Sequence, residues 1–258
     1  MKVWLKTIVA AAFLSATQAQ AVEPLKVGVS AGPYGEILEF AGKIAAKEGI
    51  EVKVIEFTDW NMPNEALARG DIDANNFQHQ PYLDNQVKQR GYDLVSVAKS
   101  VVVPMGVYSS KAETLTAIKE GSTIAIPNDP TNGARALFLL QNAGLIKLKS
   151  DDIKTSIADI AENPKKLKFV ELDAAQLPRS LDDVTAAVIT LNYAVLAKLD
   201  PKKALLLEDE GSKWHLVWAV RKGREADARI NRFIEIYRSP EVKQFVQTRF
   251  EGSIVPTW

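Results

Sequence analysis

The chain contains no cysteine among its 258 residues. This absence excludes disulfide bonds, thiolate metal sites and cysteine nucleophiles, and it leaves no thiol near the N-terminus to carry a lipid. Histidine is nearly as scarce, because only His79 and His215 are present. A histidine-rich metal site is therefore not expected, and no cofactor is predicted. Neither histidine lies beside a nucleophile motif.

An excess of charge of one sign is also absent. Lysine plus arginine and aspartate plus glutamate both total 32, so the net charge is zero. This balance does not favour nucleic acid or an anionic membrane surface as a partner. Hydrophobic residues make up 47% and charged residues 25% of the chain, which is typical of a soluble globular protein. The length predicts one large domain or two lobes.

Long apolar runs are missing, apart from one short segment at the N-terminus. Lys2 and Lys6 accompany the apolar segment Thr7–Ala16, and Ala19-Gln20-Ala21 has the small-x-small pattern of a cleavage site. The apolar segment is too short to span a bilayer comfortably. We expect a signal peptide over residues 1–21, whose removal leaves a periplasmic or secreted protein. The alternative is an N-terminal membrane anchor.

The segment that follows has the strand and helix order of an α/β protein. Leu25–Ser30 and Glu51–Phe57 alternate apolar and polar residues as strands do, and a further short strand is expected at Ile72. Helices follow the first two strands; one ends at Gly49, and the other spans Asn64–Arg69. Strands alternating with helices predict a parallel sheet covered by helices.

A similar order returns in the second half of the chain. The expected elements are the strands Thr123–Pro127, Lys168–Leu172 and Ala186–Thr190 and the helices Ala134–Asn142 and Gln176–Asp182. Two apolar extended segments, Leu94–Tyr108 and His215–Arg221, flank this unit, and two amphipathic helices close the chain. We therefore predict an α/β protein of two lobes with a double crossover and a ligand cleft between the lobes. Lobe 1 would contain residues 22–107 and 215–258, and lobe 2 residues 108–214.

Two aromatic rings and an imidazole lie close together after the strand at Ile72. Phe77, His79 and Tyr82 fall within six residues, and Pro81 suits the first turn of a helix that follows. Side chains placed where a strand ends and a helix begins commonly line a pocket. The alternative is that Phe77 and Tyr82 are ordinary core residues and that His79 is a hydrogen-bonded buried histidine.

Arg135 lies in a helix that is apolar on nearly every face, so its side chain is expected to be buried. A buried guanidinium is costly unless it is paired. Residues 128–132 are rich in helix-capping residues, which places Arg135 near a helix N-terminus, where an anion is favoured. A ligand carboxylate would satisfy it. The alternative is an internal salt bridge, for example to Asp129 or Asp183.

No set of residues resembles a catalytic site. The acidic pairs Asp151-Asp152 and Asp182-Asp183 are expected at helix starts or on the surface, and Glu208-Asp209-Glu210 is expected in a loop. A base with a neighbouring nucleophile is not recognisable.

Several segments together resemble the NlpA family of substrate-binding proteins of ABC importers. They are Phe57-Thr58-Asp59-Trp60 with Pro63-Asn64, Asp73–His79 with Pro81-Tyr82-Leu83, Pro104–Ser109, Ile126–Asn132 and Gln176–Asp183. The resemblance implies a two-lobed, type II-like periplasmic binding protein that closes around its ligand. It also implies that the protein is not an enzyme, that it delivers its ligand to an inner-membrane ABC permease, and that it is a monomer.

The resemblance also implies which residues bind the ligand. In the family, a histidine and aromatic residues surround a methionine side chain, and Phe77, His79 and Tyr82 stand at those positions. Trp60 replaces a family tyrosine, and Arg135 matches the arginine that binds the ligand carboxylate. Sulfur packs well against aromatic rings.

Two positions depart from the family pattern. Thr190 stands where the family has an asparagine that contacts the polar end of the ligand, and His215 is assigned to a second such asparagine in the returning strand. The ligand is therefore expected to be free L-methionine or a related, sulfur-containing carboxylate. The alternatives are another amino acid, a carboxylate without an amino group, or an enzyme built on the same two lobes.

Overall fold

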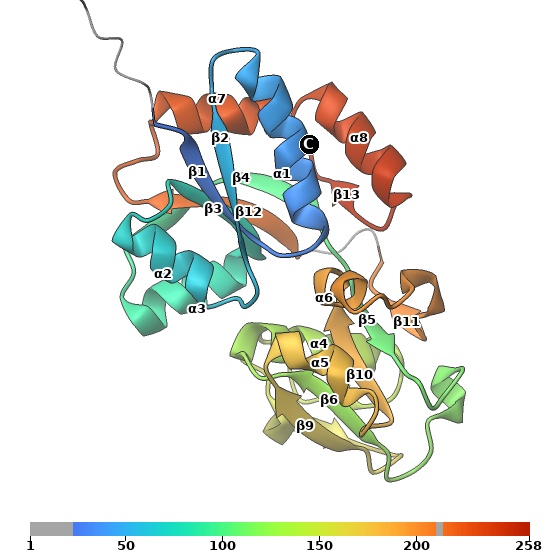
Figure 1. Ribbon diagram of the computed structural model, residues 1–258. Coiled ribbons are helices and arrows are strands. Elements are labelled where there is room, and N and C mark those ends of the chain that lie inside the picture. Colours follow the sequence, from blue (N-terminus) through green and yellow to red (C-terminus); the bar gives the residue numbers. More distant parts are fainter. Residues whose placement is uncertain (1–22, 210–213) are drawn as a thin grey trace, which may run out of the picture.

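The computed structural model describes residues 23–209 and 214–258, which form two lobes, one above the other in Figure 1. Each lobe has its own mixed sheet with helices packed against it. The predicted signal peptide, residues 1–21, lies outside the described residues. No helix among those that are described is long and apolar enough to cross a membrane.

The first lobe is built on a six-stranded sheet in the order β13-β4-β12-β3-β1-β2. Its strands are β1 (Leu25–Ser30), β2 (Val52–Phe57), β3 (Ala74–His79), β4 (Leu94–Val102), β12 (His215–Arg221) and β13 (Val255–Pro256). The strands β1, β2 and β3 run parallel, whereas β12 lies antiparallel between β3 and β4. The returning chain thus enters the middle of the sheet beside the strand that carries His79.

Five helices cover the first sheet. They are α1 (Pro33–Ala46), α2 (Met62–Arg69), α3 (Gln80–Arg90), α7 (Ala228–Tyr237) and α8 (Pro240–Phe250). The helices α1, α7 and α8 lie together on one face, and α2 and α3 lie on the other (Figure 1). On the first face Trp218 packs edge-on against Phe233 and Tyr237, all three fully buried.

The second lobe is built on a five-stranded sheet in the order β11-β5-β10-β6-β9. Its strands are β5 (Met105–Tyr108), β6 (Thr123–Pro127), β9 (Lys168–Leu172), β10 (Ala186–Thr190) and β11 (Leu206–Leu207). The helices are α4 (Pro130–Asn142), α5 (Leu177–Ser180) and α6 (Leu191–Leu196), and a two-stranded ribbon joins β7 (Lys147–Leu148) to β8 (Ile160–Glu162). The buried strands β5, β6 and β10 carry the core of this lobe.

The chain passes between the lobes twice, after β4 and after β11. Because β5 pairs with β10 and β11, residues 105–108 lie in the second sheet. Sheet membership therefore places the first crossing at Val103 and Pro104, a few residues before the boundary expected at residue 107. The return lies between Leu207 and His215.

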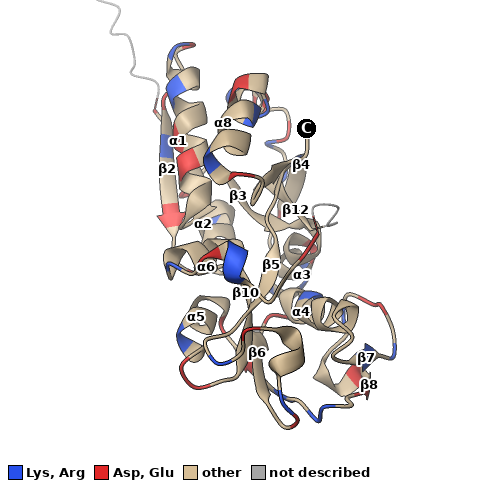
Figure 2. Ribbon diagram, turned by 90° about the vertical axis from the view of Figure 1, so that its right-hand side faces the viewer, with Lys and Arg blue, Asp and Glu red and all other residues tan. Residues whose placement is uncertain are grey.

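The α/β architecture predicted from the sequence is confirmed, with two corrections. The sheets are mixed, because the strands next to the crossovers pair antiparallel with their neighbours. The strand expected at Ile72 begins at Ala74 instead and is buried along its whole length, so Phe77 and His79 belong to the strand rather than to the segment after it. Positive and negative residues are scattered over both lobes (Figure 2).

Candidate functional site

His79 lies at the junction of β3 and α3 and caps the helix. Its Nδ1 accepts a hydrogen bond from the Tyr82 backbone N–H at 3.1 Å, so the ring proton is on Nε2. Nε2 donates to Asn132 Oδ1 at 3.0 Å. Burial, together with the nearby charge of Arg135, lowers the pKa of His79 to about 3. The imidazole is therefore neutral at pH 7 and joins the first lobe to the second.

Asn132 is held in one orientation by the start of α4. Asp129 caps this helix and accepts hydrogen bonds from the Asn132 backbone N–H and from Asn132 Nδ2, both at 3.0 Å. With Nδ2 bound to Asp129, the amide oxygen faces His79. Burial raises the pKa of the Asp129 carboxyl, and the hydrogen bonds from Asn132 and Thr131 oppose this shift.

An aromatic wall connects the two lobes next to His79. The Trp60 ring lies 5.3 Å from that of Tyr193 in α6 and 6.2 Å from that of Tyr82. The ring of Phe77 meets Tyr82 edge-on at 6.0 Å. The Tyr82 hydroxyl donates to the backbone oxygen of Trp60, and the Tyr193 hydroxyl donates to that of Thr58 across the lobes. Rings from both lobes thus form one surface.

A buried amide cluster supports this wall from behind. Asn64 and Gln78 exchange two hydrogen bonds of 2.7 Å, and Asn75 donates to Asn64 and to the Pro63 carbonyl. All three amide side chains are buried, and buried polar groups of this kind are stable only when they are paired. The cluster ties the start of α2 to β3 and so fixes the loop that carries Trp60.

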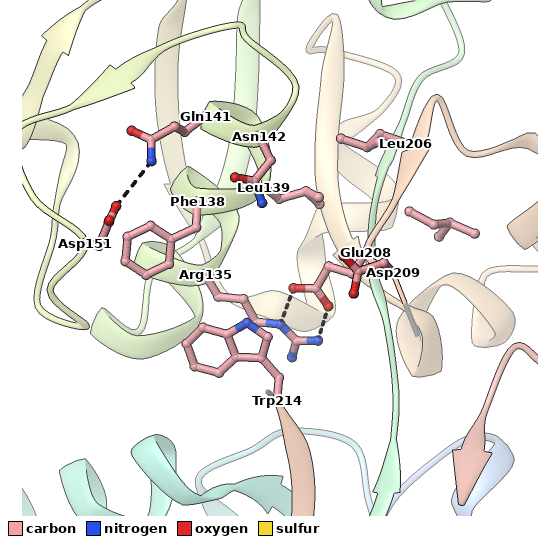
Figure 3. A pocket seen from close by; sticks show the side chains of 11 residues that line it. Arg135, Phe138, Leu139, Gln141, Asn142, Asp151, Leu206, Glu208, Asp209 and Trp214 are labelled. Atoms are coloured by element: carbon pink, nitrogen blue, oxygen red, sulfur yellow. Dashed lines mark hydrogen bonds and ion pairs between the residues drawn. The ribbon is translucent and has the colours of Figure 1, made fainter. Parts of the chain in front are cut away.

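Arg135 is buried, and its main partner is Glu208 (Figure 3). Its Nε donates to Glu208 Oε1 at 2.8 Å, and its Nη2 donates to Glu208 Oε2 and to the Val103 carbonyl. Glu208 Oε2 also accepts from the Met105 backbone N–H. The Trp214 ring lies over the guanidinium, 5.4 Å away. Arg135 is thereby fixed to both crossover segments.

This arrangement identifies the anion that pairs with Arg135. Arg135 does form an internal salt bridge, but with Glu208 rather than with Asp129 or Asp183. Glu208 lies in a loop, as expected, but its side chain is only 10% exposed. The remaining guanidinium nitrogen, Nη1, forms no hydrogen bond within residues 23–209 and 214–258. One edge of a fixed cation is therefore available to a ligand.

A small cavity of about 20 Å³ lies between the lobes at the centre of these groups. It is lined by Tyr34, Trp60, Phe77, Gln78, His79, Tyr82, Val103, Asn132, Arg135, Thr190, Asn192 and Leu216. A larger hollow of about 660 Å³ adjoins Arg135 (Figure 3), but its lining residues belong to the second lobe and the returning crossover. The smaller cavity brings rings of the first lobe together with Arg135 and other polar side chains of the second lobe.

Six of the seven residues predicted from the sequence meet at this cavity, and His215 does not. His215 pairs with Val102 at the start of β12, and the next residue, Leu216, pairs with His79 and lines the cavity. Burial and the charge of Lys99 lower the pKa of His215. Thr190 lines the cavity, and its hydroxyl donates to Asn192 Oδ1 at 2.8 Å.

Sequence reasoning missed several residues at the cavity: Tyr34, Gln78, Asn132, Asn192 and Leu216, as well as Glu208 behind Arg135. Asn132 and Asn192 lie in segments that had been recognised, next to residues given the ligand-binding roles. Gln78 and Leu216 are likewise neighbours of residues given these roles, whereas Tyr34 and Glu208 come from elements far apart in the chain, so no local pattern identifies them. In the described part of the chain, no group of three or more acidic residues and histidines could hold a metal ion.

Comparison with known proteins shows the family to which the chain belongs. Residues 25–258 match the NlpA lipoprotein family. The chain belongs to this family. The D-methionine-binding lipoprotein MetQ of Salmonella typhimurium is 47% identical over 240 residues, covering 91% of this chain and 88% of that protein, and that of Escherichia coli strain K12 is 44% identical over the same shares.

Solved structures of family members agree with the fold. A nutrient-binding protein from Burkholderia cenocepacia, bound to methionine, has a TM-score of 0.87 and 50% identity and covers 91% of this chain and 100% of its own. A periplasmic substrate-binding protein of an ABC transporter from Coxiella burnetii has a TM-score of 0.87 and 48% identity, with coverage of 90% and 100%. The periplasmic binding protein fold predicted from the sequence is confirmed.

Replacing Trp60 by alanine tests the aromatic wall. We expect ligand affinity to fall by about 2 kcal/mol, or roughly 30-fold, because the ring contacts both Tyr82 and Tyr193 where the apolar part of a ligand would lie. Calorimetric titration measures the change. Trp258→Ala is the control, since Trp258 packs on Tyr237 in the first lobe. Unaltered affinity and selectivity in folded Trp60→Ala would contradict this role.

Proposed function

We propose that the protein is the substrate-binding component of an ABC importer and that it binds methionine, or a closely related sulfur-containing carboxylate, between its lobes. The observation that carries the proposal is an interlobe cavity that adjoins both the fixed guanidinium of Arg135 and the aromatic wall. The edge of Arg135 suits a carboxylate, and rings suit a thioether. The names of the MetQ relatives and the methionine in the Burkholderia structure support the same ligand.

Lobe closure is the proposed mechanism. The cavity holds little more than one water molecule, so the lobes must move apart for a ligand the size of an amino acid to enter, and they then close around it on a wider cavity than this one. The bonds between His79 and Asn132 and between Tyr193 and Thr58 join the lobes when they are together. A ligand that contacts both lobes stabilises the closed form, because only that form offers all of its contacts.

We further propose that the protein works in the periplasm as a monomer and docks on an inner-membrane permease. Its relatives are named lipoproteins, whereas this chain has no cysteine to carry a lipid. The predicted signal peptide supports export without such an anchor. Within this proposal lobe 1 contains residues 22–103 and 215–258, and the second lobe carries Arg135.

Calorimetric titration of ligand-stripped protein tests the function. We expect saturable 1:1 binding of L-methionine or D-methionine, tighter than that of norleucine, which has the same length but lacks the sulfur atom. Mass spectrometry of the recovered ligand should show it chemically unchanged, as expected for a binding protein. If neither enantiomer binds, the proposal fails; if norleucine binds as tightly, the thioether is not what the aromatic wall recognises.

A further inference from the structure

Thr190 and Asn192 form a pair at the junction of β10 and α6. Thr190 is the N-cap residue of α6, but its hydroxyl makes no capping bond to the backbone. The hydroxyl donates instead to Asn192 Oδ1 at 2.8 Å, and both side chains are buried. Since the bond fixes the amide oxygen toward Thr190, the amide nitrogen faces the other way.

That nitrogen has no partner. Asn192 is only 1% exposed, and its Nδ2 is among the buried polar atoms without a hydrogen bond in the described part of the chain. Leaving a buried donor unpaired costs about 1–3 kcal/mol, so native proteins rarely retain one without a use for it. Because Asn192 lines the interlobe cavity, the unpaired donor belongs to the ligand site.

Three of the other polar side chains at the cavity are already engaged. Both ring nitrogens of His79 form hydrogen bonds. The Asn132 amide donates to Asp129 and accepts from His79. The Gln78 amide is hydrogen-bonded to Asn64 and Asn75. Leu216 contributes only carbon atoms. The donors left for a ligand's polar end therefore include Arg135 Nη1 and Asn192 Nδ2, both carried by the second lobe.

Close packing keeps Asn192 in place. Gly32, at the start of α1 in the first lobe, has φ of +116°, and a Cβ added there would lie 3.3 Å from the Asn192 backbone oxygen. The first lobe thus approaches the α6 backbone closely at a position suited to glycine. The start of α6 therefore lies directly against the first lobe, which restricts movement of the Asn192 backbone beside the cavity.

We infer that Asn192 is a second carboxylate-binding residue, which donates Nδ2 to the ligand beside Arg135, and that Thr190 is its positioning residue. The inference rests on the proposed function and assigns the polar contact to Asn192 rather than to Thr190 itself. A carboxylate accepts several hydrogen bonds, so it can be shared by a guanidinium edge and an amide donor.

The test is calorimetric titration of Asn192→Asp with methionine and with methioninamide, which lacks the carboxylate. The substitution keeps the size and the oxygen that faces Thr190 but replaces the donor by a carboxylate oxygen. We expect methionine affinity to fall at least tenfold and up to roughly 150-fold, the range for a hydrogen bond to a charged group. Affinity for methioninamide should change by less than about threefold. Asn231→Asp on α7 controls for the added charge.

Thr190 is tested with a matched pair of variants. Thr190→Val keeps the shape but removes the hydroxyl, and we expect it to lower methionine affinity about three- to tenfold while leaving affinity for methioninamide nearly unchanged. Thr190→Ser keeps the hydroxyl and should restore methionine affinity to within about twofold of the unaltered protein.

The possible outcomes separate the inference from the function on which it rests. Equal losses for both ligands in Asn192→Asp would make the residue merely structural and overturn the inference. Retained or increased methionine affinity in that variant would mean that the amide oxygen faces the ligand's ammonium group, which also overturns it. If the unaltered protein bound no methionine at all, the proposed function would fail and the inference with it.

Discussion

Replacing Arg135 by alanine is expected to lower ligand affinity by about 2–4 kcal/mol, or roughly 30- to 1000-fold. The guanidinium is buried, and Arg135 lines the cavity in which a ligand carboxylate would bind. Much of the loss would arise because the ligand's carboxylate is left in a desolvated site without a cation. Calorimetric titration of the folded variant measures it.

The same substitution removes the partner of Glu208. A buried carboxylate that loses its cation destabilises a protein by about 3–5 kcal/mol, so the melting temperature should fall as well. The double variant Arg135→Met with Glu208→Gln removes both charges and should recover part of that stability without recovering ligand affinity. This pair of results would separate the binding role of Arg135 from its structural role.

Arg232→Ala is the matched control for Arg135. Arg232 is half-exposed and pairs with Glu48 and Glu235 on the first lobe. Surface pairs of this kind contribute about 0–1 kcal/mol to stability, so neither the affinity nor the melting temperature should change greatly. Unaltered affinity in folded Arg135→Ala would overturn the role proposed for the guanidinium.

Acidification is expected to destabilise the protein through His79. Its pKa is about 3 in the folded protein and 6.5 as an ordinary value, because burial and Arg135 disfavour the charged ring. Between these two values the unfolded chain binds a proton that the folded chain does not, so the free energy of unfolding falls as pH falls from about 6.5 to about 3. The full loss from this group is on the order of 5 kcal/mol.

Urea unfolding at a series of pH values measures this effect. His79→Asn is the informative variant, because asparagine also caps a helix but does not titrate. It should flatten the pH dependence relative to the unaltered protein. His215→Asn is the comparison: the pKa of His215 is also lowered, but its ring is only partly buried, so its loss should flatten the pH dependence less than the loss of His79. Parallel pH curves for the unaltered protein and His79→Asn would contradict the prediction.

Both predictions concern groups that connect separate parts of the fold. Arg135 bonds the Val103 carbonyl in one crossover and Glu208 in the other, while Glu208 bonds the start of β5. His79 reaches from β3 to the cap of α4. A ligand held by Arg135 would therefore lie against the two crossover segments that connect the lobes. Binding there suits the proposed mechanism, in which the lobes close around the ligand.

The strands were predictable wherever the pattern is local. β1, β6, β9, β10 and β12 have the bounds expected from the alternating or continuous apolar runs of the sequence. Helix starts were less predictable. The helix expected at Ala134 begins at Pro130, because the Asp129 side chain caps it and proline fits its first turn.

The sequence by itself determined the α/β class, the aromatic and histidine cluster, and the need of Arg135 for an anionic partner. These follow from spacing along the chain and from the cost of burying a charge. The tertiary structure determined which anion pairs with Arg135. This anion is Glu208, which is 73 residues away in the sequence and is brought to Arg135 by the second crossover.

Strand register decided the remaining assignments. Successive residues of a strand face opposite sides of its sheet, and β12 also has irregular pairing near its start, so only the pairing with β3 and β4 shows that Leu216 and not His215 faces the cavity. In the same way, the bond from Thr190 to Asn192 determines which atom of the amide is left for a ligand. Both depend on contacts between elements, which a linear pattern does not encode.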